Sequence, residues 1–96
     1  MTKIHLQIHG KVQGVLYRQS ARELAKLLGL DGWIKNNPNG TVELEARGPE
    51  EAIEQFLSWC RKGPPRAEVH QITVVSREVM EPAPACSDHR HFQIVG

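Results

Sequence analysis

The chain has 96 residues, of which 40% are hydrophobic and 24% charged, a composition typical of a globular protein with one hydrophobic core. Twelve Lys and Arg residues against eleven Asp and Glu leave a formal charge of +1, so no broad positive field exists to hold a nucleic acid or an acidic membrane surface. No segment is long and apolar enough to be a membrane span, and the N-terminus does not resemble a signal peptide. We therefore expect residues 1–96 to form a single cytoplasmic domain.

The first half of the chain predicts a strand, a loop, a helix and a hairpin. Residues 4–8 alternate apolar and polar, which is the period of a strand with one buried face. Residues 21–28 carry an apolar stripe at helical spacing, and Gly29 stands where a helix commonly ends. Residues 32–36 and 42–46 predict two strands, and the turn sequence NPNG between them predicts a hairpin.

The second half predicts another helix and two more strands. Pro49 and the two glutamates after it suit the first turn of a helix, and the sequence GPP at 63–65 ends that helix. Residues 67–79 favour a strand because they are rich in β-branched side chains. A proline-containing loop at 81–91 leads to a last short strand at 92–94.

The order of these elements is β-α-β-β-α-β with an additional terminal strand, which predicts an α+β fold of the ferredoxin-like, split βαβ type. We expect two helices on one face of a mainly antiparallel sheet of four or five strands. The crossover through the first helix is right-handed, so the third strand should insert between the first and the second.

The loop between the first strand and the first helix has the sequence GKVQGVLYR at 10–18. Glycines relieve backbone strain in such a loop, and its N–H groups, close to a helix N-terminus, can converge on one phosphate. The residues placed to bind phosphate are Gln13, Gly14, Val15, Leu16, Tyr17 and Arg18. Arg18 adds a planar cationic fork suited to phosphate oxygens. The alternative is that the two glycines only form a tight turn. The loop lacks the glycine patterns of ATP-binding and dinucleotide-binding loops.

A second motif, GWIKNNPNGTVELEARG at 32–48, accompanies this loop. Together the two motifs resemble the paired signatures of the acylphosphatase family, with Tyr17 where phenylalanine is more usual and Ile34 where a valine or small residue is usual. The resemblance covers nearly the whole chain. It implies hydrolysis of acyl phosphates, the mixed anhydrides of a carboxylic acid and phosphate, with no metal and no cofactor. It also implies that Arg18 binds the phosphoryl oxygens and that Asn36 holds the attacking water.

This reaction needs no general acid, because a carboxylate is a good leaving group whereas an alkoxide must be protonated as it leaves. We therefore expect the partners to be an acyl phosphate and inorganic phosphate, with little activity on alkyl phosphate monoesters. The C-terminal carboxylate of Gly96 is a candidate to orient Arg18, because the chain ends directly after its last predicted strand.

Other chemistry-bearing side chains lack the spacing of a functional site. We expect the histidines to be solvated, the tryptophans to be buried against the fold and the cysteines to be reduced. We expect one acidic pair on the polar face of a strand and the other at a helix N-terminus. These residues are His5, His9, His70, His89, His91, Trp33, Trp59, Cys60, Cys86, Glu43, Glu45, Glu50 and Glu51.

Three alternative interpretations are compatible with this topology or this loop. RNA-recognition modules have the same element order, but they need exposed aromatic residues on central strands that here read IHLQI and VELEA. A non-catalytic anion sensor would use the loop but would not need Asn36. The family's domain also begins a larger hydrogenase-maturation protein, whose cysteine-rich zinc region is lacking here. We expect a free-standing, monomeric enzyme that binds neither nucleic acid nor membranes.

Overall fold

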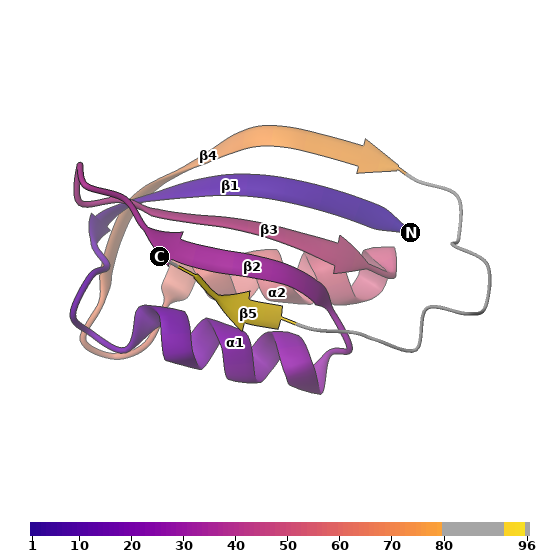
Figure 1. Ribbon diagram of the computed structural model, residues 1–96, viewed down its shortest axis with the longest axis horizontal. Helices are drawn as coiled ribbons and strands as arrows, with labels where there is room; N and C mark the ends of the chain where they lie inside the picture. The colour runs from indigo at the N-terminus through magenta and orange to yellow at the C-terminus, as the bar shows by residue number, and fades with distance from the viewer. Residues whose placement is uncertain (80–91, 96) are drawn as a thin grey trace.

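The computed structural model describes residues 1–79 and 92–95. Its elements in chain order are β1 (Thr2–Lys11), α1 (Tyr17–Leu27), β2 (Asp31–Asn36), β3 (Val42–Gly48), α2 (Glu50–Lys62), β4 (Glu68–Val79) and β5 (Phe92–Ile94). The strands form one sheet in the order β4-β1-β3-β2-β5, and both helices lie on one side of it (Figure 1). Every neighbouring pair is antiparallel except β2 and β5. The expected ferredoxin-like α+β fold is confirmed, with a sheet of five strands. The predicted loop at 81–91, with Cys86, His89 and His91, and the terminal Gly96 lie outside the described residues.

The core lies between the sheet and the two helices. Ile4, Leu6 and Ile8 of β1 face the helices and are at most 1% exposed, which the alternating sequence predicts. Phe56 of α2 meets Phe92 of β5 edge to face, with ring centroids 5.7 Å apart. Burial of Phe92 therefore anchors the short last strand to the same core.

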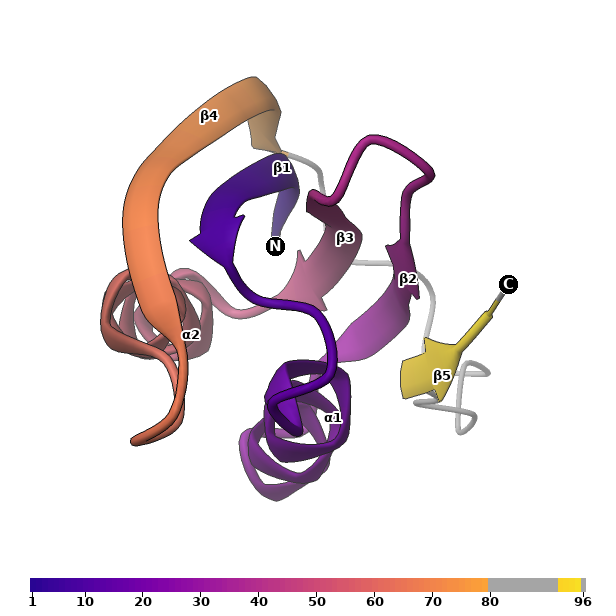
Figure 2. The same cartoon turned by 90° about the vertical axis from the view of Figure 1, so that its left-hand side faces the viewer.

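The position of β3 decides where the chain's functional segments meet. β3 lies between β1 and β2 and is antiparallel to both, so β1 and β2 run in the same direction. The ends of β1 and β2 and the start of α1 consequently lie at one end of the molecule, which Figure 2 turns toward the viewer. This arrangement places Asn36, the last residue of β2, at the same end as Arg18 in the first turn of α1.

Tyr17, the buried first residue of α1, joins the start of α1 to the end of α2. Its hydroxyl donates a hydrogen bond to the carbonyl oxygen of Cys60 at 2.7 Å. A helical carbonyl normally accepts from the N–H four residues on, but that residue here is Pro64, which has no N–H. Burial raises the pKa of Tyr17, so the phenol keeps the proton that it donates.

We expect Tyr17→Phe to lower the free energy of unfolding by about 1–3 kcal/mol, because the buried Cys60 carbonyl would lose its donor while the ring packing is kept. Urea unfolding followed by circular dichroism measures the change. Turnover should be unaffected, since the phenol points into the core rather than toward solvent. An unchanged unfolding midpoint would show that the hydrogen bond contributes nothing.

The expected burial of Trp33 against the fold is only partial. Trp33 lies half-buried on the outer face of the sheet, because its neighbour Ile34 takes the inward position and is fully buried. The indole meets the His5 ring edge to face at 5.6 Å between centroids, and the Lys35 ammonium lies 5.6 Å from the indole centroid. Trp59 does pack against the core, as expected.

Two of the described histidines form side-chain hydrogen bonds rather than being simply solvated. Nε2 of His5 lies 2.6 Å from a carboxylate oxygen of Glu43, and Nε2 of His9 lies 3.2 Å from the hydroxyl of Thr73. All four side chains belong to the outer face, where the sheet brings neighbouring strands into register. The sequence could not show these pairs because each joins residues on different strands.

Candidate active site

The loop between β1 and α1 contains two residues with left-handed backbone conformation. Gly14 has a φ of 73° and Leu16 a φ of 64°. A non-glycine residue in this region is strained by about 1–3 kcal/mol, and such strain often occurs at functional sites. The Leu16 side chain is 68% exposed, so its own burial does not account for the strain. The strained backbone indicates instead that the conformation of this loop serves a function.

No side chain of the described residues caps the N-terminus of α1, and no acidic residue lies in its first turn. The first helical hydrogen bond runs from the N–H of Ser20 to the carbonyl of Leu16 at 3.0 Å. The N–H groups of residues 17–19 therefore have no partner within the helix. With the partial positive charge of the helix end, they form a site that favours an anion.

A cavity of about 280 Å³ opens at this helix end. Its lining residues are Val12, Gly14, Leu16, Tyr17, Arg18, Gln19 and Ile94. Arg18 is the one charged residue among them, and in the described part of the chain its guanidinium has no hydrogen bond or ion pair. None of these lining residues is a carboxylate, and a guanidinium beside N–H groups without helical partners suits a phosphate.

The six residues predicted to bind phosphate separate into two groups. Gly14, Leu16, Tyr17 and Arg18 line the cavity, whereas Gln13 and Val15 do not. Val15 is partly buried against the core. No sequence signal pointed to Ile94 as a lining residue, because only the parallel pairing of β5 with β2 brings it here.

The side chain of Gln13 connects the loop to the turn that follows β2. Its Nε2 donates to the carbonyl oxygens of Asn37 at 2.8 Å and Thr41 at 3.0 Å. The sequence predicted that Gln13 offers its backbone N–H to phosphate, and it held no signal for these side-chain contacts. The two hydrogen bonds couple the position of the loop to that of the turn beside Asn36.

Asn36 carries an unpaired hydrogen-bond acceptor at this end of the sheet. Side chains alternate along a strand, so Asn36 shares the helix-facing side of β2 with the fully buried Ile34. Its Oδ1 is buried and has no hydrogen-bond partner among residues 1–79 and 92–95. Buried carbonyl oxygens are normally paired, so this oxygen is an acceptor available to a water or a substrate.

A polar network on the outer face holds the residue after Asn36. Nδ2 of Asn37 donates to the Thr41 hydroxyl and to a carboxylate oxygen of Glu43, both at 3.1 Å. Partial burial alone would raise the pKa of Glu43, but hydrogen bonds from Asn37 and His5 and the nearby positive charge outweigh it and lower that pKa. The ionised Glu43 thus fixes Asn37, and with it the end of β2.

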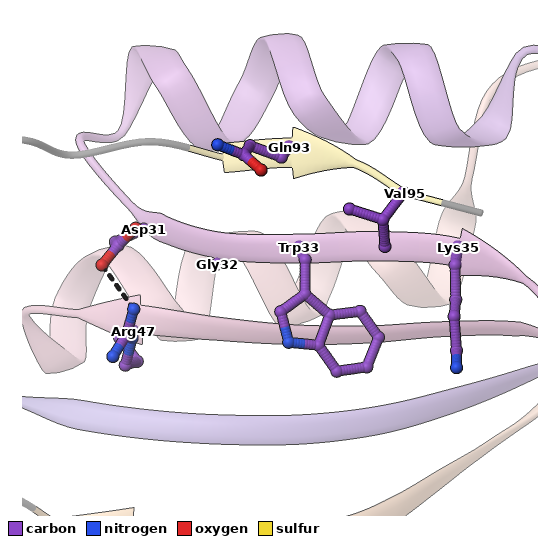
Figure 3. Close-up of a pocket in the computed structure, with 7 residues that line it drawn as sticks. All are labelled: Asp31, Gly32, Trp33, Lys35, Arg47, Gln93 and Val95. Atoms are coloured by element: carbon purple, nitrogen blue, oxygen red, sulfur yellow. Dashed lines mark hydrogen bonds and ion pairs between the residues drawn. The ribbon is translucent and has the colours of Figure 1, made fainter.

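A larger cavity, of about 440 Å³, lies on the outer face between Asp31 and Val95 (Figure 3). Its cations already have partners, since Arg47 Nη2 lies 2.6 Å from the Asp31 carboxylate and Lys35 lies over the ring of Trp33. It also includes no helix N-terminus. The cavity at α1 is therefore better suited to a phosphate than this larger one.

Two further observations concern metals and membranes. Within the described ranges, no three or more His, Cys, Asp or Glu residues gather in a metal-binding cluster. Of the helices described, none is both long and apolar enough to cross a membrane.

Cys60 is a buried free cysteine, and burial raises the pKa of its thiol to about 12, so the thiol stays neutral.

The class that this ferredoxin-like sheet fits is a small phosphate-handling protein, since within the described ranges the end of α1 is uncapped and both the Arg18 guanidinium and the Asn36 amide oxygen lack partners. The acylphosphatase family model matches residues 4–94. An acylphosphatase from Methylococcus capsulatus is 49% identical over 74 residues, covering 77% of this chain and 80% of the relative. One from Thiobacillus denitrificans is 44% identical over 78 residues, covering 81% and 88%. The crystal structure of acylphosphatase from Bacillus subtilis matches with a TM-score of 0.86 at 32% identity, covering 100% of both chains. The chain belongs to the acylphosphatase family, and it is an enzyme that hydrolyses acyl phosphates.

Proposed function

We propose that this enzyme hydrolyses acyl phosphates to a carboxylate and inorganic phosphate without a metal or other cofactor, using the cavity at α1. The backbone of residues 13–18 binds the phosphoryl group, Arg18 neutralises its charge and Asn36 orients the attacking water. The observation that carries this proposal concerns residues 1–79 and 92–95: among them the guanidinium of Arg18 has no partner, no carboxylate lines its cavity, and no side chain caps the helix N-terminus beside it.

The role proposed for Arg18 is electrostatic. A guanidinium cannot act as a base at neutral pH, but its parallel N–H donors can bind two phosphoryl oxygens as charge builds up on them in the transition state. The water oxygen forms a bond to phosphorus while the bond to the bridging oxygen breaks. The bridging oxygen leaves with the electron pair as part of the carboxylate, and its low basicity makes protonation unnecessary.

The role proposed for Asn36 is to position the nucleophile. A side-chain amide oxygen accepts a hydrogen bond from water without taking its proton, so it can direct a lone pair of the water toward phosphorus. Support comes from the buried Oδ1, which has no partner in the described part of the chain and therefore has its acceptor capacity free for a water. The proton lost by the water goes to a phosphate oxygen or to solvent.

We further propose that residues 1–96 act as a single domain, as a cytoplasmic monomer whose partners are small molecules. Cations on the outer face of the sheet are paired within the chain, with Lys3 3.2 Å from Glu45 and Arg47 2.6 Å from Asp31. This pairing argues against a nucleic-acid surface, which needs free cations and exposed aromatic residues.

Benzoyl phosphate and benzyl phosphate form a matched pair to test this function, because they differ only in a carbonyl group in place of a methylene. We expect kcat/KM to be higher for benzoyl phosphate by on the order of a thousandfold, since the enzyme supplies no general acid for the alkoxide. Both rates are measured in EDTA. Similar rates on the two substrates, or loss of benzoyl phosphate turnover in EDTA, would contradict the proposal.

A further inference from the structure

Three cations follow one another along α1 at intervals of four residues: Arg18, Arg22 and Lys26. Residues four apart lie on the same face of a helix, about 6 Å apart along its axis. β5 runs beside α1 (Figure 1), and the segment at 92–94 faces this row. The first cation, Arg18, lines the proposed phosphate site, so the other two lead away from it along the helix.

A third cavity, of about 420 Å³, lies between these two elements and is called here the α1–β5 groove. It is lined by Arg22, Lys26, Phe92, Gln93 and Ile94. Ile94 also lines the cavity at Arg18, so the groove and the proposed phosphate site meet at this residue. The Ile94 side chain is 39% exposed and gives the junction an apolar surface.

The two cations of the groove are available to a ligand. Arg22 and Lys26 are exposed, and neither has a hydrogen bond or an ion pair to any other described residue. None of the described residues that line the groove is a carboxylate. The cations of the outer face differ, since Lys3 and Arg47 both have carboxylate partners. The groove therefore combines an apolar junction with two unneutralised positive charges.

We propose that the α1–β5 groove binds the acyl part of the substrate and favours acyl phosphates whose acyl group carries a second anionic group at its far end. This inference rests on the proposed phosphate site at Arg18. With the phosphate bound there, the acyl group extends over Ile94, whose surface suits hydrocarbon. A second anion then reaches Arg22 one helical turn away, and a longer acyl group reaches Lys26.

The expected selectivity is moderate because both cations are exposed to solvent. Exposed charge pairs are weak and are screened by salt, so each cation should contribute about two- to fivefold in kcat/KM. Most of the effect should appear in KM, because the second anion lies away from the reacting phosphorus and is bound equally in the ground state and the transition state.

The test compares 4-carboxybenzoyl phosphate with benzoyl phosphate. The para carboxylate lies across the ring from the acyl carbon, cannot react with it, and barely changes the leaving group. We expect the wild-type enzyme to prefer the carboxylated substrate by about fivefold at low salt, and less as salt is raised. Arg22→Glu should bring this ratio of kcat/KM values below one, and Arg22→Gln should bring it close to one. A general loss of activity cancels in the ratio.

Arg61→Glu is the matched control, because Arg61 is an exposed arginine in the last turn of α2 that lines neither cavity. It makes the same change in net charge and should leave the preference unchanged. An active wild-type enzyme with no preference, or an equal loss of preference in Arg61→Glu and Arg22→Glu, would overturn the groove proposal alone. A wild-type enzyme inactive on benzoyl phosphate would overturn the proposed function and, with it, the groove.

Discussion

Arg18→Lys should lower kcat/KM for benzoyl phosphate by at least about a hundredfold, which is the usual effect of removing one preorganised donor from a transition state. Lysine keeps the positive charge but replaces the planar fork with a single ammonium, so two phosphoryl oxygens can no longer be held in parallel. No other charged residue among the described ones lines the cavity to compensate. Inorganic phosphate should also bind more weakly, and its inhibition constant measures this.

Arg66→Lys serves as the control for this prediction. Arg66 is exposed and does not line the cavity, so the same chemical change there should leave both kcat/KM and the phosphate inhibition constant as in the wild-type enzyme. Near-normal turnover by Arg18→Lys would mean that a point charge suffices and that the fork geometry has no role.

Asn36→Ala should reduce kcat by about a hundredfold or more while the inhibition constant for inorganic phosphate stays close to the wild-type value. The alanine removes the acceptor that orients the water, whereas phosphate is held by Arg18 and the helix N–H groups. The free energy of unfolding should not fall, because the buried Oδ1 has no partner among the described residues whose hydrogen bond would be lost.

This combination separates positioning of the water from a structural role for Asn36. A residue needed only for the fold would lose stability together with activity, and denaturant unfolding of Asn36→Ala detects that outcome. Lys35→Ala is the matched control, since Lys35 precedes Asn36 on the same strand but lies on the outer face. Asn36→Ala with near-normal kcat would show that the water is held by another group.

The fold followed from local patterns that physical chemistry constrains strongly. The alternation over residues 4–8 predicted a strand with one buried face, and β1 alternates buried and half-buried residues from Thr2 to His9. Pro49 and its two glutamates predicted the start of α2, which begins at Glu50. These predictions succeeded because the spacing of apolar residues along an element determines which of its faces is buried, whichever elements pack against that face.

Trp33 shows that the local sequence pattern can fail to predict which side chain faces the core. In the segment from Gly32 to Asn36, Trp33 and Ile34 are both apolar and point to opposite faces, so the alternation does not decide which one enters the core. The pairing of Trp33 with Glu45 and of Ile34 with Leu44 decides it, because Leu44 is a core residue of the central strand β3. That register is a long-range property of the sheet.

For the candidate site, the sequence by itself determined the chemistry: a glycine loop ending in Arg18, and an asparagine at the end of a strand, both within motifs that resemble one family. Tertiary structure alone decided the surroundings. It brought Ile94 of β5 into the cavity at Arg18, it placed β5 beside Arg22 and Lys26 of α1, and it tied Gln13 to the turn after Asn36. The reason is that backbone conformation and side-chain chemistry are local. Contacts across a sheet join residues far apart in the chain, and only the complete fold, with its strand order and register, determines them.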